Sequence, residues 1–442
     1  MLGRFSFVPE FSAIDPAGRT AAVVAVSGGG DSLALLLLLD AFLRQRPDLP
    51  LRLLAVTVDH GLRPEAAEEA RQVAAFCANL GIPHRVMRWD GPKPASRISE
   101  AAREARQRLL AQAATDAGAD IVFLAHTADD QVETVAMRMA RGGGRGLAGI
   151  APATLYENRV WFLRPLLGAR RADLRSFLAE RNVRWIEDPS NTNPRYERAR
   201  VRQALSEEEI ARLLAVARDA AERREALGRE VAAWFQEYLR LSAPGLLSFP
   251  VSAMRAAPRD VQVYAFRLLL ACAGGASQLP DESRASAMLV QLLEEPGRAT
   301  LSRAIAARQR DRIYLCREGR NLPRQSAENG ALWDNRFRVR VHGLPADHGV
   351  AIAPRGRERL PETDLPDGAL PTGLVRAALA AEPVLERNGE ALPSLDGVCL
   401  QRVIGPWATL VPSFDYDLAA ALSSAIGGEI LPAKPWLCHK QG

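Results

Sequence analysis

The sequence predicts an α/β fold, with a doubly wound parallel sheet in its first half, then a mostly helical domain and a small α+β C-terminal region. Two observations carry this prediction. Short apolar runs alternate with helical segments over roughly residues 20–180, as they do where parallel strands are joined by crossover helices. Beyond Ser206 the chain becomes charged and helical, and strand-like runs return only after Pro296.

The first strand and helix of this pattern have the clearest signals. An apolar run at 21–26 ends in the glycine turn SGGGDS, and a leucine-rich segment follows at once. A second strand is predicted at 51–58, and the helix after it ends at Gly81, because glycine commonly follows a helix. The next predicted elements are strands at 84–89, 120–125 and 162–167 and helices over 97–117 and 172–181.

A change in composition marks the predicted domain boundaries. From Glu207 to about Leu241 the sequence is helical and rich in charges, which indicates a connector into a second domain. Short strand-like runs at 312–316 and 337–341 belong to a third. The three predicted domains are 1–206, 207–295 and 296–442.

The composition excludes several classes of protein. Apolar residues make up 48% and charged residues 25% of the chain, which is ordinary for a globular protein. The longest apolar run, Leu33–Leu39, is far shorter than the roughly 20 residues that span a bilayer, so no membrane partner is expected. Without a secretory signal, the expected location is the cytoplasm. The five cysteines lack the short spacings of zinc, iron–sulfur or redox pairs.

The glycine turn has the composition of a phosphate-binding loop. Glycines let the backbone approach an anion, and the following helix directs NH groups and the positive end of its dipole at it. The turn lacks the Lys-Ser/Thr ending of a Walker A loop. The alternative is a tight turn in which Asp31 or Ser32 caps the helix. The predicted phosphate-binding residues are Ser27, Gly28, Gly29, Gly30, Asp31 and Ser32.

A second candidate site is the acidic start of the helix after the fourth strand. Asp130 and Glu133 fall on neighbouring helical positions, so their oxygens can converge on one site beside His126. The alternative is a capping box, in which Thr127 is the N-cap and Asp130 answers it three residues later. Hard oxygen ligands suit Mg²⁺, which accompanies nucleoside triphosphates, and Asp31 and Glu133 are the candidate metal ligands.

Basic residues at two places point to anionic ligands. His60 and Arg63 follow the second strand, on the ligand edge of the sheet, where a plain loop is the alternative. Arg103 and Arg106 lie three residues apart on one helix face and can meet phosphates, unless that face is only solvated.

Two later segments are basic enough to contact a nucleic acid. Arg141 lies in a glycine-rich loop after the acidic helix, where a flexible surface loop is the alternative. Arg195, Arg198 and Arg202 belong to a run with four arginines in eight residues, which creates a strong local positive field. The net charge of +5 permits a polyanionic partner without establishing one.

Residues 27–32 match the SGGxDS signature of the PP-loop ATP pyrophosphatases, and from here a family resemblance becomes specific. Four further motifs resemble the tRNA(Ile)-lysidine synthetases and occur in that family's order. They are VDHGLR at 58–63, HTADDQVET at 126–134, RPLL at 164–167 and DPSN at 188–191. Together these motifs cover roughly residues 20–202.

The resemblance implies a two-step reaction. ATP is cleaved between its α and β phosphates, and AMP passes to the wobble cytidine of the isoleucine tRNA with a CAU anticodon. The ε-amino group of L-lysine then displaces AMP. The implied partners are that tRNA and lysine, the implied cofactors are ATP and Mg²⁺, and a homodimer is left open. The segment 1–206 would be the catalytic domain, and 207–295 and 296–442 would bind tRNA.

The resemblance also implies roles for the candidate residues. The loop residues 27–32 would bind ATP. Lysine attack needs an acceptor for the amine proton, for which Asp130 is the first candidate and Asp129 or His126 the alternatives. The implied catalytic residues are Asp31, His126, Asp130 and Glu133. The implied substrate-binding residues are His60, Arg63, Arg103, Arg106 and Asp129. The implied tRNA-binding residues are Arg141, Arg195, Arg198 and Arg202.

Two positions depart from the family's pattern. Gln107 stands where the pattern Ala-Arg-x-x-Arg-Tyr has Tyr, and Ala199 stands where Asn usually follows Arg. Other functions also fit a PP-loop, and one of them is amidation of a small metabolite. Thiolation of a tRNA base would need cysteines near the loop, where Cys77 stands alone. A non-catalytic RNA-binding protein would keep the ATP fold as a scaffold.

Overall fold

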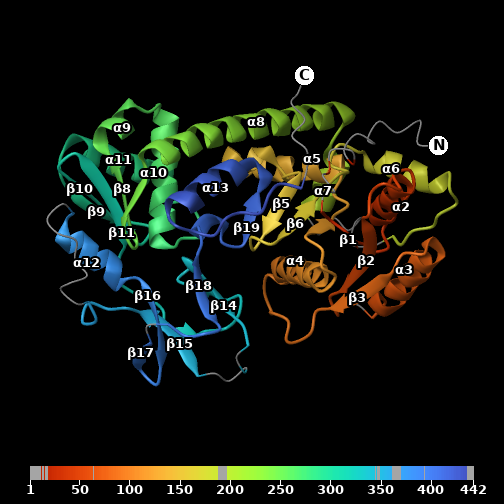
Figure 1. Cartoon of the computed structure of the whole chain (residues 1–442). Coiled ribbons are helices and arrows are strands. Elements are labelled where there is room, and N and C mark those ends of the chain that lie inside the picture. The colour runs from red at the N-terminus through yellow and green to blue at the C-terminus, as the bar shows by residue number, and fades with distance from the viewer. Residues whose placement is uncertain are drawn as a thin grey trace. The chain divides into compact units, whose positions relative to one another are not determined.

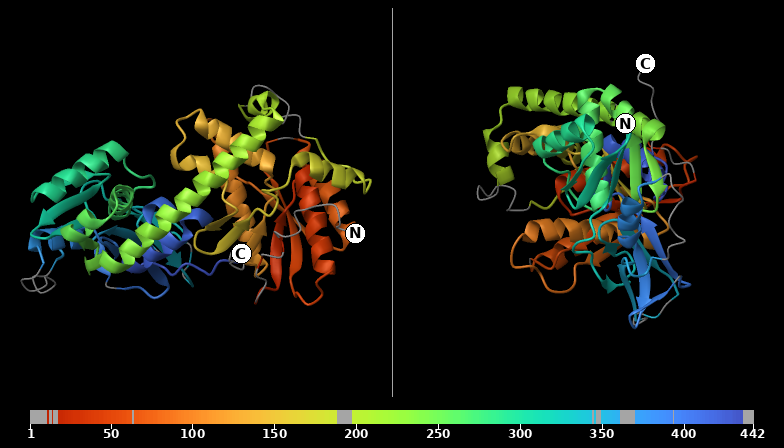
Figure 2. Two further views of the ribbon diagram at one scale, coloured as in Figure 1. Left: turned by 90° about the horizontal axis from the view of Figure 1, so that it is seen from above. Right: turned by 90° about the vertical axis from the view of Figure 1, so that its left-hand side faces the viewer.

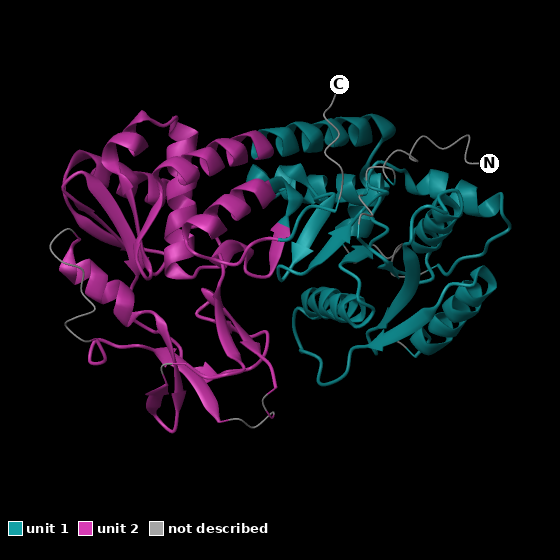
Figure 3. Ribbon diagram, viewed as in Figure 1, with its two compact units in different colours: residues 1–224, 412–414, 432–442 teal, residues 225–411, 415–431 magenta. Residues whose placement is uncertain are grey.

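The 442-residue chain forms two compact units, which Figure 3 distinguishes by colour. Unit 1 is Met1–Arg224 with Pro412–Phe414 and Pro432–Gly442, and unit 2 is Glu225–Val411 with Asp415–Leu431. The structure is a computed structural model, and the residues it describes are 11, 14, 18–62, 64–187, 197–343, 345, 349–360, 370–392 and 394–435.

Unit 1 alternates strands and helices along the chain, as Figure 1 shows. Its elements are β1 (Ala21–Ala25), α2 (Gly30–Arg44), β2 (Arg52–Asp59), α3 (Ala66–Leu80), β3 (His84–Arg88), α4 (Ile98–Asp116), β4 (Ile121–Phe123), α5 (Ala128–Met139), the 3₁₀ helix η1 (Gly144–Ala148), β5 (Ala153–Tyr156), β6 (Val160–Leu163), α6 (Arg171–Ala179) and α7 (Glu197–Ala204). Its sheet contains the series β5-β6-β4-β1-β2-β3, in which every neighbouring pair except β5-β6 is parallel. The predicted α/β fold is confirmed.

The strand β1 lies inside this sheet because its side chains are apolar on both faces. Ala22, Val23 and Val24 are fully buried, and β1 pairs in parallel with β2 and β4. The helices α3 and α4 lie on opposite sides of β2 and β3 (Figure 1). Because these strands are parallel, their carboxyl ends lie at one edge of the sheet, where open α/β sheets bind ligands.

The strand β5 is the exception to the predicted parallel sheet. It forms an antiparallel hairpin with β6, and the turn residues Glu157 and Asn158 both have positive φ, 46° and 59°. The strand predicted at 162–167 is β6 and ends at Leu163. Both strands are buried on both faces, and a short apolar run does not reveal strand direction or its exact ends.

A single long helix, α8 (Glu207–Tyr238), follows α7, and Figure 2 shows it as one unbroken element. It confirms the helix predicted from Glu207. Near its start, Leu213 and Ala217 pack against Val132 and Val135 of α5. The compact units divide within α8, between Arg224 and Glu225. The three-domain division at 206 and 295 stays a prediction.

Unit 2 is built from three small sheets and their helices. Its elements are β7 (Arg240–Ala243), β8 (Leu246–Pro250), α9 (Val251–Ala256), α10 (Arg259–Gly274), α11 (Glu282–Glu294), β9 (Arg298–Leu301), β10 (Ala304–Gln309), β11 (Arg312–Arg317), β12 (Gln325–Ser326), β13 (Leu332–Trp333), β14 (Phe337–Val341), β15 (Val350–Pro354), α12 (Thr372–Ala380), β16 (Pro383–Arg387), β17 (Glu390–Leu392), β18 (Val398–Arg402), η4 (Gly405–Trp407) and α13 (Tyr416–Ala425). The sheet orders are β7-β8-β11-β10-β9, β12-β15-β16-β17 and β13-β14-β18. Strand β19 (Leu410–Pro412) and η5 (Ser413–Asp415) span the boundary between the units.

The strands predicted at 312–316 and 337–341 are confirmed as β11 and β14. The strands β7 and β8 were not predicted, because strands of four or five residues carry little periodicity. Antiparallel pairing of β8 with β11 joins them to one sheet. Within the described residues, no helix is both long and apolar enough to cross a membrane.

Candidate functional site

The loop between β1 and α2 is held by its own serines. The backbone NH of Ser27 donates to Oγ of Ser32 at 3.1 Å, and the Ser32 hydroxyl donates to the Gly29 carbonyl at 2.9 Å. No side chain caps α2, so the alternative in which Asp31 or Ser32 is its cap is not observed. An uncapped helix start is the condition for an anion to take that position.

Gly28 is needed for the shape of this loop. Its φ is 85°, and an added methyl group would lie 2.5 Å from Cδ1 of Ile186, whose backbone NH donates to the Gly28 carbonyl at 3.0 Å. A methyl group added at Gly30 would lie 3.5 Å from the nearest atoms of the Trp185 ring, which is an ordinary van der Waals distance. The segment of Trp185 and Ile186, to which the sequence assigned no role, therefore lines the loop.

The start of α5 is both a capping box and part of an acidic cluster. The backbone NH and hydroxyl of Thr127 donate to Oδ2 of Asp130 at 2.8 and 3.0 Å, and the Asp130 NH donates back to Thr127 at 3.4 Å. Oδ1 of Asp130 accepts a hydrogen bond from Nη2 of Arg171 at 3.1 Å. The two predicted uses of Asp130 are therefore compatible, since each occupies a different oxygen.

Arg171, the first residue of α6, joins three acids that we term the carboxylate group: Asp31, Asp130 and Glu133. Its Nε donates to Oδ2 of Asp31 at 3.0 Å, and its Nη1 lies 3.6 Å from Oε1 of Glu133. Burial raises the pKa of Asp31, and the charge of Arg171 opposes that rise. Burial lowers the pKa of Arg171, but the charges of Asp130 and Asp31 outweigh it and raise that pKa above its usual range.

Glu133 is the most buried member of the carboxylate group, with 2% of its side chain exposed. Its Oε1 accepts a hydrogen bond from Nε of Arg202 at 2.7 Å. Its Oε2 is buried without a hydrogen-bond partner, and so is Oγ1 of the neighbouring Thr134. A buried carboxylate oxygen without a partner is costly unless a ligand, ion or water supplies one.

The carboxylate group fits Mg²⁺ that is bound together with a nucleotide. The candidate metal ligands Asp31 and Glu133 both face Arg171, and Oε2 of Glu133 accepts no hydrogen bond. Across the described part of the chain, no three His, Cys, Asp or Glu side chains are arranged to hold a metal ion. Mg²⁺ needs only one or two carboxylates where phosphates and waters complete its shell.

Asp129 helps to position the start of α6. Its Oδ2 accepts the backbone NH of Arg171 at 2.7 Å, and its Oδ1 accepts Nε of Arg170 at 3.4 Å. Arg170 also pairs with Glu207, at the start of α8, at 2.8 Å. Asp129 is thus engaged with the backbone that carries Arg171, and its predicted contact with substrate stays a prediction.

A basic cluster, which we term the arginine group, adjoins the carboxylate group. Its members are Arg103, Arg106, Arg164 and Arg198. Burial lowers the pKa of His126 well below its usual value, and all four arginines act in the same direction. Burial, Arg103 and Arg198 lower the pKa of Arg106. Like charges held this close suit an anionic ligand.

Arg164, from the RPLL motif, is the buried centre of this cluster. Only 5% of it is exposed, and its Nη1 donates to the Ala151 carbonyl at 2.9 Å and to Oγ1 of Thr154 at 3.0 Å. Burial, followed by the charges of Arg103 and Arg106, lowers its pKa to about 9. Its Nε and the Nδ1 of His126 are both buried without a partner. We take these two atoms as candidate contacts for a ligand.

His60 follows β2 and stands edge-on to Trp89, with ring centroids 6.0 Å apart. Its Nδ1 is buried without a partner, and burial, followed by the charge of Arg106, lowers its pKa. His60 therefore lies within the electrostatic influence of Arg106, a member of the arginine group on α4. Arg63 lies outside the described residues.

The predicted tRNA-binding residues divide into two kinds. Arg141 is exposed and hydrogen-bonds to Glu197, the first residue of α7, and Arg198 is exposed on the same helix. Arg202, by contrast, pairs with Glu133 in the carboxylate group. Arg195 lies outside the described residues.

Arg171 is the main residue that sequence reasoning missed. A signal for it exists, because the sequence places Arg170 and Arg171 at the start of a helix. Positive charges are unfavourable there, where the helix dipole has its positive end. Two arginines at this position therefore indicate that a nearby acid neutralises their charge, although the sequence does not show which acid.

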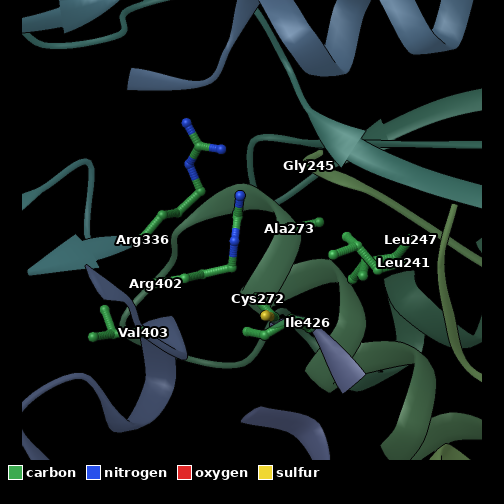
Figure 4. A pocket seen from close by; sticks show the side chains of 9 residues that line it. All are labelled: Leu241, Gly245, Leu247, Cys272, Ala273, Arg336, Arg402, Val403 and Ile426. Atoms are coloured by element: carbon green, nitrogen blue, oxygen red, sulfur yellow. The ribbon is translucent and has the colours of Figure 1, made fainter. Parts of the chain in front are cut away.

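Unit 2 holds a small pocket whose charged lining is arginine (Figure 4). The side chains of Arg336 and Arg402 extend to the same side of it. Both pair with Glu382, and Nε of Arg336 also donates to Asp334 at 2.7 Å. These arginines are thus partnered within unit 2, and we assign them to its packing. A thiol reaction is disfavoured here, because burial raises the pKa of Cys272 to about 11.

A family described as a PP-loop domain matches residues 7–209. The tRNA(Ile)-lysidine synthase of Mesorhizobium japonicum is 43% identical over 430 residues, which are 94% of this chain and 94% of that protein. The enzymes of the same name from Rhizobium meliloti and Brucella melitensis biotype 2 are 39% and 37% identical, each over 93% of this chain and 93% and 95% of their own. The chain belongs to the tRNA(Ile)-lysidine synthase family.

Proposed function

We propose that this protein attaches L-lysine to the wobble cytidine of the isoleucine tRNA with a CAU anticodon, using ATP and releasing AMP and pyrophosphate. The observation that carries the proposal is the carboxylate group, which adjoins both the SGGGDS loop and the arginine group. A cation site and an anion site side by side suit a reaction between an ammonium-bearing amino acid and a nucleoside triphosphate.

The first proposed step is adenylation of the tRNA. The oxygen on C2 of the cytidine attacks the α phosphorus of ATP, and the bond from that phosphorus to the bridging oxygen of pyrophosphate breaks. The uncapped start of α2 would hold the pyrophosphate. Arg103 and Arg106 would bind phosphate groups of the substrates, since a bound anion relieves the repulsion between the two arginines.

The second proposed step is attack of the lysine ε-amine on C2, with AMP as the leaving group. An amine with pKa near 10.4 costs roughly 4.6 kcal/mol to deprotonate at pH 7. The proposed acceptor is Asp130, whose Oδ1 is turned away from the helix cap toward Arg171. His126 is the alternative acceptor, because its lowered pKa keeps the ring neutral. Asp129 is the weaker candidate, since its Oδ2 accepts the backbone NH of Arg171 at 2.7 Å and so is engaged with the start of α6.

We propose Asp31 and Glu133 as the protein ligands of Mg²⁺, which would neutralise phosphate charge. The proposed contacts with tRNA are Arg141, Arg195 and Arg198, with Arg63 near the substrate. A tRNA substrate implies that the protein works in the cytoplasm. A homodimer remains compatible with this proposal.

The decisive experiment supplies ATP, Mg²⁺, radiolabelled lysine and total tRNA. Label is expected to enter only the tRNA that carries a CAU anticodon and accepts isoleucine. ATP–pyrophosphate exchange with and without tRNA provides the second measurement. Label in no tRNA, or in lysine-accepting tRNA alone, would reject the proposal, and an RNA-binding scaffold would bind tRNA without any exchange.

A further inference from the structure

We propose that Arg171 is an internal counter-ion of the carboxylate group, which competes with incoming cations for Asp130 and Glu133 and so sets their affinity. The identity of the natural cations rests on the proposed function. The competition itself rests on the geometry of Arg171.

Each nitrogen of the Arg171 guanidinium faces a different carboxylate. Nε, Nη2 and Nη1 lie 3.0, 3.1 and 3.6 Å from oxygens of Asp31, Asp130 and Glu133 respectively. Its side chain is 16% exposed. A guanidinium that meets three acids in this way occupies the positions where an ammonium group or a hard metal ion would bind.

The acids have supports that do not depend on Arg171. Oδ2 of Asp130 belongs to the capping box with Thr127, and Oε1 of Glu133 accepts the Arg202 hydrogen bond. The two carboxylates can therefore keep their places when the guanidinium leaves them.

The backbone of Arg171 is fixed while its side chain has four flexible bonds. Asp129 holds the backbone NH at 2.7 Å, and α6 begins at that residue. The guanidinium can thus exchange with a cation without any movement of α6. Asp129 accordingly acts as a positioning residue for Arg171.

The test compares the wild-type protein with Arg171→Gln and with the matched control Arg175→Gln. Arg175 lies one turn along α6, is 46% exposed and pairs with Glu187. Binding of Mg²⁺ alone, and separately of L-lysine alone, is measured by titration calorimetry and by the rise in melting temperature, at constant ionic strength.

Removal of the competitor is expected to tighten Mg²⁺ binding by about tenfold or more, since one charged hydrogen bond no longer has to be broken. The melting temperature of cation-free Arg171→Gln should fall, and Mg²⁺ should raise it more than in the wild type. Arg175→Gln should stay within about twofold of the wild type, because exposed ion pairs contribute little.

If Arg171 only stabilises the fold, the melting temperature of Arg171→Gln would fall and Mg²⁺ would not raise it again. Unchanged or weaker Mg²⁺ affinity in Arg171→Gln overturns the proposal. Arg171→Lys keeps the charge but has a shorter side chain without the planar guanidinium, so its Mg²⁺ affinity should lie between those of the wild type and Arg171→Gln. Tighter Mg²⁺ binding without any lysine binding would support the counter-ion role and count against lysine as the substrate.

Discussion

Arg202 donates a hydrogen bond of 2.7 Å from Nε to Oε1 of the buried Glu133, and it thereby joins α7 to α5. The arginine run predicted to meet RNA thus has one member inside the site. Its neighbour Arg198 is exposed and belongs to the arginine group instead. The two arginines should therefore respond differently to substitution.

Arg198→Ala is expected to weaken tRNA binding and to reduce the slope of log affinity against log salt by about one unit, as loss of a phosphate contact does. Arg202→Ala should leave that slope nearly unchanged and lower the free energy of unfolding by about 1–3 kcal/mol, because Glu133 loses its closest partner. Filter binding over a salt series and urea unfolding provide the measurements. Equal slopes for both variants would contradict the distinction.

Asp31→Asn is expected to reduce pyrophosphate release by about 10²-fold or more while the fold persists. An amide can still accept the hydrogen bond from Arg171 but is a poor ligand for Mg²⁺. The control is Asp40→Asn on the same helix, where the acid pairs with exposed Arg44 at 2.8 Å. Near wild-type turnover of Asp31→Asn at ordinary Mg²⁺ concentrations would remove this residue from the metal site.

Asp130→Asn is expected to separate the two chemical steps, so that adenylated tRNA accumulates. Lysine attack should slow by about 10²-fold or more without the carboxylate, and raising the pH from about 7 to 9.5 should restore part of the rate, because solvent then supplies free amine. Single-turnover assays follow both steps.

Thr127→Ala is the control for the capping role of Asp130. It removes the hydroxyl side of the capping box and should cost on the order of 1 kcal/mol in stability without slowing lysine attack. Equal loss of both steps in Asp130→Asn, with no rescue by pH, would transfer the base role to His126 or Asp129.

The stability of the protein should fall as the pH decreases below about 6.5, in part because of His126. Its pKa is lowered in the folded state by burial and the arginine group, so the unfolded chain binds the proton first. The destabilising effect of His126 is absent above the unfolded pKa of 6.5, and it grows as the pH falls toward the pKa of the folded state. The slope for one group is at most about 1.4 kcal/mol per pH unit. His126→Gln should flatten the acid side of the profile measured by urea unfolding, and an unchanged profile would show that other groups govern it.

The sequence by itself determined the parallel α/β fold, the glycine turn at 27–32 and the acidic start of α5. Each of these is a local pattern: a strand followed by glycines and a helix, or a Thr127 cap answered by Asp130. Local patterns can be predicted from the sequence because neighbouring residues in the chain create them. The short strands β5, β7 and β8 were missed, since strand pairing depends on distant partners.

Only the tertiary structure decided which charges meet. Arg171 and Asp31 are 140 residues apart in sequence, and Arg202 and Glu133 are 69 apart, yet both pairs are hydrogen-bonded. The same holds for Ile186, whose contact with Gly28 depends on how the chain returns to the first loop. Charge pairing acts through space over a few ångströms, so a linear sequence can supply the arginines and acids without specifying their partners.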